Sequence, residues 1–311
     1  MIEVQGITKK FGKLVAVDDV SLSVGPGEVY GFIGPNGAGK STTMKVLACL
    51  LRPDSGTALV DGLDVTQDGD KIRRILGYMP DVLGVYDDLT VEEYLHFFAA
   101  AFGLPRKNRK GTIEGVLELT DLTEKKKSMV DSLSRGMKQR LGVARILVHD
   151  PKVLLLDEPA SGLDPRARIE MRELLTELAR MGKALIVSSH ILSELGEMST
   201  SIGIIERGRL LYSGSIDDAY AKISVGDRVK VRIEESDEML TPVRAAIGND
   251  SRVSSAEIQG GSLVIELAPD QKNHHFLIEL LIAKNVRIAS FTPEIPRLED
   301  AFMSLTKGQV Q

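Results

Sequence analysis

The stretch that decides the fold is Gly34-Pro35-Asn36-Gly37-Ala38-Gly39-Lys40-Ser41-Thr42, which fits the pattern G-x-x-x-x-G-K-[ST]. It follows an expected buried strand over residues 28–33 and precedes a helix expected from Lys40 to about Leu51. Glycines let such a loop curl so that backbone N–H groups and the helix N-terminus face phosphates. Lys40 would reach the β- and γ-phosphates, and the Ser41 hydroxyl would bind Mg²⁺. The alternative is an ordinary glycine-rich turn, which the strand–loop–helix context disfavours.

The composition excludes several classes of protein. The 311 residues correspond to about two domains of ~150 residues each, and 43% hydrophobic with 27% charged residues is typical of a folded globular chain. The net charge of −5 provides no overall basic field to attract nucleic acid or anionic lipid. We therefore expect no nucleic-acid partner, and we expect any membrane role to come through a protein partner.

The single cysteine, Cys49, excludes an internal disulfide and fits a reducing compartment. The sequence has no signal-peptide pattern at its start and no run near the ~20 apolar residues that span a bilayer. These features predict a cytoplasmic chain that is neither secreted nor directly inserted into the membrane.

Hydrophobic periodicity divides the chain into three blocks. A mixed α/β pattern, including a short βαβ-like stretch after residue 52, extends to Asp81. A helical block follows, and strand–helix–strand returns with a buried strand over 153–156, a helix over 166–181 and a strand over 184–188. The expected helices of the middle block are 91–102, which begins with a capping box at Thr90, then 112–119 and 136–147.

Beyond about Ala221 the pattern becomes that of a small α+β module. The expected order is βαββαβ plus a final helix, which suggests a ferredoxin-like domain. Its expected elements are a strand 227–233, a helix 238–247, two strands around Gly260-Gly261, a helix 272–283, a strand 286–291 and a helix from Leu298.

Two adjacent carboxylates, Asp157 and Glu158, follow the expected strand 153–156. The carboxyl edge of a parallel sheet is where such sheets bind ligands. Asp157 suits Mg²⁺ through water, and Glu158 suits a base that orients an attacking water. Two acids after a strand are more often a helix cap or a solvated turn, but their position downstream of a phosphate loop favours a functional role.

A second candidate anion site begins the helix at Ser134 and Gly136, in the segment Leu133-Ser134-Arg135-Gly136-Met137-Lys138-Gln139. A small polar residue and a glycine leave N–H groups open to an anion there. By itself this pattern is only a helix start.

The motifs, and the order in which they follow one another along the chain, resemble those of the nucleotide-binding subunits of ATP-binding cassette (ABC) transporters. The matching elements are Phe11 ahead of the loop, the Walker A loop Gly34–Thr42, the signature Leu133–Gln139, Walker B Val153–Glu158, the D-loop Ser161-Gly162-Leu163-Asp164 and the switch histidine His190. The resemblance implies a P-loop NTPase cassette over residues 1–221, with a mixed sheet and a helical subdomain at about 85–150. Residues 222–311 would form the accessory or regulatory domain.

The resemblance also implies roles for individual residues. Phe11 would stack on adenine, Ser134 and Gly136 would touch phosphate, and Asp164 would organise a dimer interface. His190 would contact the γ-phosphate. The nucleotide-contacting set is Phe11, the loop Gly34–Thr42, Ser134, Gly136 and Asp164; the catalytic set is Glu158, His190 and Lys40; the metal ligands are Ser41, Asp157 and Asp81.

The function that the resemblance implies is that of an ATPase, with ATP and Mg²⁺, which acts as the motor of a bacterial exporter. One chain carries one Walker A loop and one signature, so a homodimer of cassettes is implied, with a separate permease chain as membrane partner. The C-terminal segments 291–293 and 296–302 resemble the extension found on cassette subunits of bacterial exporters. Such a chain would be peripheral to the inner face of the membrane.

Two positions depart from the family pattern. The signature reads LSRGM where the family has LSGGQ, so Arg135 replaces a glycine and Met137 a glutamine. Asp81 stands where the family usually has a glutamine. Two alternative functions remain: an ABC ATPase without a permease, acting on ribosomes or DNA, and a nucleotide-binding regulator without hydrolysis. The absence of a second cassette, a long coiled coil or a basic patch argues against the first, and the presence of Lys40 and Glu158 against the second.

Overall fold

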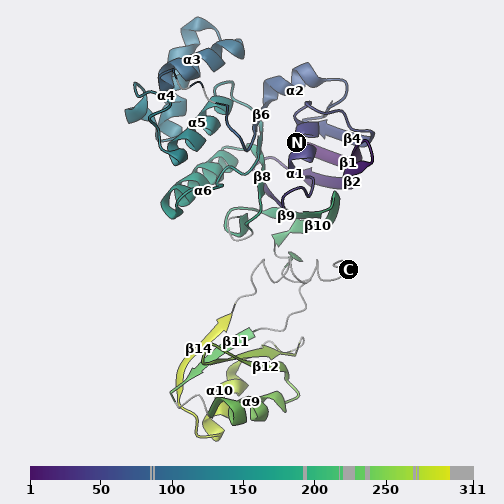
Figure 1. Cartoon of the computed structure of the whole chain (residues 1–311), viewed down its shortest axis with the longest axis vertical. Coiled ribbons are helices and arrows are strands. Elements are labelled where there is room, and N and C mark those ends of the chain that lie inside the picture. Colours follow the sequence, from purple (N-terminus) through teal and green to yellow (C-terminus); the bar gives the residue numbers. More distant parts are fainter. Residues whose placement is uncertain are drawn as a thin grey trace. The chain divides into compact units, whose positions relative to one another are not determined.

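The described part of the chain folds into two compact units. The computed structural model describes residues 1–84, 86, 88–191, 195–216, 218–219, 228–234, 239–268, 271 and 273–294 (Figure 1). The first unit is Met1–Ile216 and the second is Asp217–Gln311. Within the described ranges, no helix combines the length and the apolar character that crossing a bilayer requires.

A six-stranded sheet with the order β10-β9-β3-β8-β7-β6 forms the centre of the first unit. Its strands are β3 (Val29–Ile33), β6 (Leu76–Met79), β7 (Val153–Leu156), β8 (Ala184–Ser189), β9 (Ser201–Glu206) and β10 (Arg209–Ser215). The sheet is mixed, as predicted, because β10 pairs antiparallel with β9 while the other pairs are parallel. Every residue of β3, β7 and β8 is buried, which explains why these strands consist mainly of apolar residues.

A four-stranded antiparallel sheet with the order β2-β1-β4-β5 completes the strands of the first unit. Its strands are β1 (Ile2–Phe11), β2 (Leu14–Val24), β4 (Ser55–Val60) and β5 (Leu63–Asp64). One hydrophobic cluster joins both sheets, since it contains Ile2 of β1 as well as Phe32 of β3. The βαβ-like order predicted after residue 52 is present as β4, β5, a helix over Gly69–Ile75 and β6, but β4 and β6 belong to different sheets and do not form a parallel pair.

The helices of the first unit include a separate block between β6 and β7. The helices with given bounds among the described residues of this unit are α1 (Lys40–Leu47), α2 (Gly69–Ile75), α3 (Val91–Ala101), α4 (Arg106–Leu119), the short 3-10 helix η1 (Thr123–Lys125), α5 (Arg135–Leu147) and α6 (Pro165–Arg180). Figure 1 shows α3, α4 and α5 gathered on the side of the six-stranded sheet away from β1, β2 and β4. The capping box of α3 is present: Thr90 Oγ1 accepts from the Glu93 N–H, and Glu93 Oε2 accepts from the Thr90 N–H.

Two helix boundaries in the first unit differ from the prediction by about four residues or more. Helix α4 begins at Arg106 rather than at residue 112. The prediction missed this start because the first five residues, RKNRK, carry no apolar side chain that could show a helical period. Helix α1 ends at Leu47 rather than near residue 51. Cys49, just beyond it, takes a left-handed φ of 56°, which cannot continue a right-handed helix.

The second unit contains a four-stranded antiparallel sheet with the order β12-β13-β11-β14. Its elements are β11 (Arg228–Ile233), α9 (Leu240–Gly248), β12 (Val253–Gln259), β13 (Ser262–Leu267), α10 (His275–Ala283) and β14 (Ile288–Glu294). The βαββαβ order of the ferredoxin-like module is therefore confirmed. The final helix expected from Leu298 and the segment 296–302 lie outside the described residues.

Replacing Leu277 by alanine should destabilise the second unit by about 2–5 kcal/mol, because it removes a large side chain from a packed core. Leu277 on α10 is fully buried in a cluster formed by this unit. Chemical denaturation followed by circular dichroism would measure the loss. The matched control is Ile282→Ala on the same helix, where a side chain 61% exposed predicts a change within about 0.5 kcal/mol. Equal losses in both variants would contradict the assignment of this core.

Candidate functional site

The predicted phosphate loop lies between β3 and α1, as the sequence indicated. Gly39 is the N-cap of α1 and has a φ of 113°, which side chains rarely tolerate. A Cβ atom on Gly39 would also lie 2.6 Å from the backbone oxygen of Ala16. Only glycine therefore fits at this point, and the loop enters the helix in the conformation that the motif requires.

The loop forms one wall of a cavity of about 290 Å³. Segments distant in the sequence meet there, because β1, the loop, the residues after β6 and the end of β7 all contribute to it. The lining residues are Phe11, Leu14, Ala16, Pro35, Asn36, Gly37, Ala38, Gly39, Lys40, Ser41, Thr42, Asp81 and Glu158. The predicted residues Phe11, Asp81 and Glu158 are thus brought onto the phosphate loop. Phe11 is an aromatic residue of this lining, and 47% of its surface is exposed.

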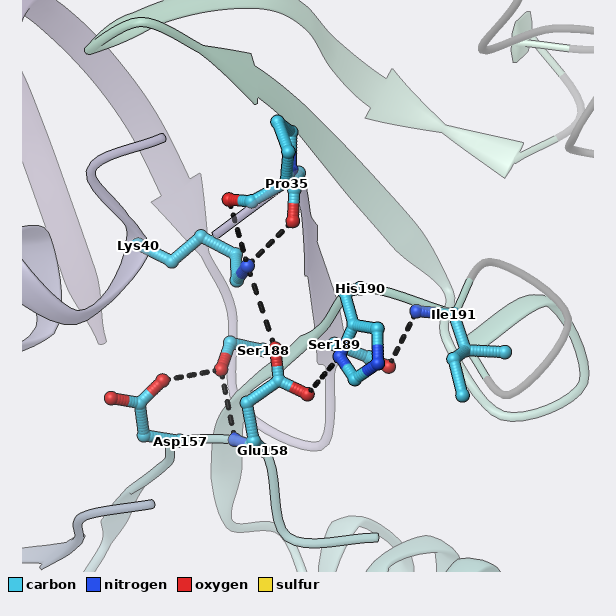
Figure 2. Close-up of polar contacts among 9 residues, drawn as sticks. Pro35, Lys40, Asp157, Glu158, Ser188, Ser189, His190 and Ile191 are labelled. Atoms are coloured by element: carbon cyan, nitrogen blue, oxygen red, sulfur yellow. Dashed lines mark hydrogen bonds and ion pairs between the residues drawn. The ribbon is translucent and has the colours of Figure 1, made fainter. Parts of the chain in front are cut away.

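Lys40 is the buried cation of the cavity, with only 5% of its surface exposed. Its Nζ donates to the backbone oxygens of Gly34 at 2.5 Å and Pro35 at 3.3 Å (Figure 2). It also lies 3.4 Å from Oε1 of Glu158. The phosphate loop and the carboxylate that follows β7 are therefore in direct electrostatic contact.

Glu158 also contacts the predicted switch histidine. Its Oε2 lies 2.7 Å from Nδ1 of His190, which follows β8 (Figure 2). Glu158 has a φ of 52°, in the left-handed region, which costs a non-glycine residue about 1–2 kcal/mol. This unusual backbone at a carboxylate in a cavity is the kind of strain found at functional sites.

Ser188, which the sequence analysis did not single out, connects the two carboxylates. Its hydroxyl donates to Asp157 Oδ1 at 2.6 Å and accepts from the Glu158 N–H at 2.9 Å. Both Ser188 and Asp157 are buried, so these hydrogen bonds fix the position of the Asp157 carboxylate. The only sequence signal for Ser188 was its place in the run VSSH, two residues before His190.

The neighbouring carboxylates and burial both act on the Asp81 carboxyl. Desolvation and then the charges of Asp157 and Glu158 raise the pKa of the Asp81 carboxyl, while Arg135 and His190 act in the opposite direction. A cation bound near Asp81 and Asp157 would relieve this repulsion.

The donor set fits Mg²⁺ better than a metal held by protein alone. No group of three or more His, Cys, Asp or Glu side chains is arranged to hold a metal among the described residues. Mg²⁺ commonly takes only one or two carboxylates and completes its shell with water and substrate phosphates. Ser41 and Asp81 line the cavity, and Asp157 adjoins Glu158, so oxygen ligands of the right kind are present.

The signature residues occupy a different place. Ser134 is the N-cap of α5, where its hydroxyl accepts from the Met137 N–H at 3.3 Å. Asp164 is the N-cap of α6 and accepts from the Ala167 N–H at 2.9 Å. Among the described residues that line the cavity, neither of these two appears, nor does Gly136. The fold of one chain therefore does not bring the signature onto its own phosphate loop.

Similar proteins support the family assignment. Residues 17–161 match the family described as "ABC transporter". The linearmycin resistance ATP-binding protein LnrL of Bacillus subtilis (strain 168) is 31% identical over 308 residues, covering 98% of each chain. The probable multidrug ABC transporter ATP-binding protein YbhF of Escherichia coli (strain K12) is 39% identical over 236 residues, which are 76% of this chain and 41% of YbhF. This chain thus spans less than half the length of YbhF.

Structural similarity supports the same assignment. The dimeric structure of MJ0796, a bacterial ABC transporter cassette, superposes with a TM-score of 0.63 at 25% identity, covering 70% of this chain and 99% of that one. The ordered motifs, their geometry and these matches lead to one conclusion: the chain belongs to the family of ABC transporter ATP-binding proteins, which hydrolyse ATP to drive transport.

Proposed function

We propose that this chain is the ATP-hydrolysing motor of a bacterial ABC exporter and drives a separate membrane permease through ATP-dependent dimerisation. The observation that carries the proposal is the contact between Lys40 and Glu158 on the cavity lined by the phosphate loop. A cation for the phosphates and a carboxylate for the attacking water are the two groups that hydrolysis of ATP requires most. Their contact also argues against the non-hydrolysing alternative.

The cavity wall divides into a part for the base and a part for the phosphates. Phe11 stacks on adenine, since it is the exposed aromatic side chain of the lining. The amides of Gly34–Thr42 and the N-terminus of α1 hold the phosphates, and Lys40 exchanges its carbonyl contacts for the β- and γ-phosphates.

Glu158 acts on the water that attacks the γ-phosphorus. As the new bond to the water oxygen forms and the bond to ADP breaks, the carboxylate orients the water and accepts its proton. His190 positions the carboxylate through the 2.7 Å hydrogen bond and contacts the γ-phosphate with its exposed edge. Ser188 holds Asp157 in place on the other side.

When bound, Mg²⁺ supplies positive charge beside the β- and γ-phosphate oxygens. We assign its protein ligands to the Ser41 hydroxyl and the Asp157 carboxylate, with Asp81 as a third oxygen donor at the cavity wall. The nearness of the Asp157 and Glu158 charges to Asp81, and the lack of a group of three or more metal-ligating side chains among the described residues, support this set.

A second copy of the chain completes each nucleotide site. The phosphate loop lines a cavity that Ser134 and Gly136 do not reach in the same chain. We therefore assign those two residues, with Asp164, to the nucleotide and interface of a partner copy. The similarity to a cassette whose structure is described as dimeric supports this arrangement.

The membrane partner is a separate permease, and the direction of transport is export. LnrL is named for linearmycin resistance and YbhF as a probable multidrug transporter protein, which supports export rather than uptake. The chain then works at the inner face of the cell membrane, held there by the permease. Residues 1–221 are the ATPase domain and residues 222–311 the accessory or regulatory domain, a division supported by the two compact units.

Replacing Phe11 by alanine should weaken ATP binding several-fold, because it removes a stacking contact of about 1 kcal/mol, while maximal turnover stays near normal. Calorimetric titration with ATP and steady-state kinetics would measure both quantities. Phe11→Tyr keeps an aromatic face and should keep the affinity. The control is Phe97→Ala, which removes an equally exposed aromatic at a different place. Unchanged affinity in Phe11→Ala would mean that another group holds the base.

Replacing Asp81 by alanine should reduce permease-stimulated hydrolysis and transport more than ATP binding, because Asp81 begins the loop between the cavity and the helical block. The complex with the co-purified permease would serve for all three measurements. Asp70→Ala is the control, since this acid is fully exposed on α2, away from the cavity. Equal binding, hydrolysis and transport in Asp81→Ala and the parent would assign Asp81 to a passive turn.

Replacing Glu158 by glutamine should lower hydrolysis by about 10²–10⁴-fold, because the amide keeps the shape but cannot accept a proton. ATP binding should persist, since Lys40, Ser41 and the loop amides remain. Phosphate release and binding of a fluorescent ATP analogue would separate the two effects. Glu177→Gln, on the exposed face of α6, is the matched control. Hydrolysis at the parental rate in Glu158→Gln would disprove the catalytic assignment.

A further inference from the structure

Tyr78, on β6, carries a buried hydroxyl group that forms no hydrogen bond with any residue in the described part of the chain. Most buried polar side-chain atoms have a partner, so an unpaired one calls for an explanation, such as a catalytic role or a partner that arrives with a ligand. The position of Tyr78 in the central sheet indicates which part of the site that partner belongs to.

The register of the sheet places Tyr78 and Asp157 on the same face of neighbouring strands. Tyr78 pairs with Leu155 on β7, and Asp157 follows two residues after Leu155. The ladder continues to this point, because the Asp157 N–H donates to the backbone oxygen of Met79 at 2.9 Å. Residues two apart on a strand point to the same face, so Tyr78 lies beside Leu155 on the face to which Asp157 also belongs.

Asp157 lies between hydroxyl-bearing residues from the strands on its two sides. Strand β7 has β8 as one neighbour and β6 as the other. The Ser188 hydroxyl, from β8, already donates to Asp157 Oδ1 at 2.6 Å. The Tyr78 hydroxyl, from β6, is unpaired. The strand order therefore supplies a second hydroxyl on the side of Asp157 that Ser188 leaves open.

The ring of Tyr78 is held on this face by the helix that follows the phosphate loop. It packs against the hydrophobic cluster that contains Met44 and Leu47 of α1. Helix α1 begins with Lys40 and Ser41 at the cavity. Tyr78 is thus on the same side of the sheet as the helix that carries Ser41, one of the proposed metal ligands.

Two proposed metal ligands act electrostatically on the hydroxyl. Burial, and then the charges of Asp157 and Asp81, raise the pKa of Tyr78 to about 12. The hydroxyl therefore keeps its proton at neutral pH and can both donate and accept a hydrogen bond. Such a group can bond to water near the carboxylates without adding charge to the site.

We propose that Tyr78 is a positioning residue for Mg²⁺, and that its hydroxyl hydrogen-bonds to the water shell of the ion beside Asp157. The inference rests on the proposed function, which assigns the ion to Ser41, Asp157 and Asp81. Mg²⁺ in proteins keeps several of its waters, and groups around the ligands of a metal orient those ligands. Tyr78 acts through water in this role and touches neither the ion nor the nucleotide.

The test compares binding of a non-hydrolysable ATP analogue in EDTA and in Mg²⁺ for Tyr78→Phe, which removes only the hydroxyl. Affinity in EDTA should stay at the parental value, because Lys40 and the loop amides remain. The gain in affinity on adding Mg²⁺ should fall about tenfold, as for other groups that support metal ligands. Titration of Mn²⁺ into the analogue-bound protein, followed by electron paramagnetic resonance, should show the same loss.

The matched control is Tyr30→Phe, a buried tyrosine on β3 of the same sheet whose hydroxyl is hydrogen-bonded to Ser213. It should keep the parental metal affinity. Removing the unpaired hydroxyl of Tyr78 should leave the stability of the metal-free protein unchanged or raise it, and chemical denaturation would check this. Parental metal affinity in Tyr78→Phe would overturn the inference. An equal loss of analogue affinity in EDTA would also overturn it, because the residue would then act on the fold or the nucleotide.

Asp157→Asn separates this inference from the proposed function. This change should weaken Mg²⁺ binding by itself, and adding Tyr78→Phe should then cost less than it does in the parent, because both groups act on one water shell. Fully additive losses would overturn the inference and leave the metal site in place. Unchanged Mg²⁺ affinity in Asp157→Asn would overturn the metal assignment of the proposed function and this inference with it.

Discussion

The ion pair between Lys40 and Glu158 connects the two segments on which the site depends. Lys40 is the first residue of α1 and follows the phosphate loop after β3, whereas Glu158 follows β7. Strand β8 lies between β3 and β7 in the sheet. Both charged groups are almost fully buried, so each relies on the other for compensation of its charge. The parallel order β3-β8-β7 is therefore a requirement of the chemistry, because it brings three strand ends to one cavity. Ser188, near the end of β8, and His190, directly after it, then complete the group.

Local sequence patterns predicted the parts of the first unit whose conformation is determined locally. The phosphate loop, the buried strand 153–156 and the capping box at Thr90 each carry a complete signal within a few residues. Ser188 carries no such local signal, because its role comes from hydrogen bonds with Asp157 and Glu158, which follow the neighbouring strand β7. The same reason applies to β4 and β6: nothing in the stretch 52–81 indicates that its strands join different sheets.

Other features of the structure were not predicted from the sequence or concern more than one chain. The start of α4 lacks the apolar spacing that predicts helices, so its first turn was missed. The roles assigned to Ser134, Gly136 and Asp164 stay predictions, because they concern a second copy. The structure of one chain places Ser134 and Gly136 at the start of α5 and Asp164 at the start of α6.

The left-handed backbone of Glu158 carries a strain of about 1–2 kcal/mol, which glycine at this position would relieve. Glycine would also remove the carboxylate beside Lys40 and leave a buried ammonium group without its partner, a loss of about 3–5 kcal/mol. The charge of a neighbouring side chain therefore keeps a costly backbone conformation in place at position 158, and a substitution that lowers the backbone energy there would still weaken the fold.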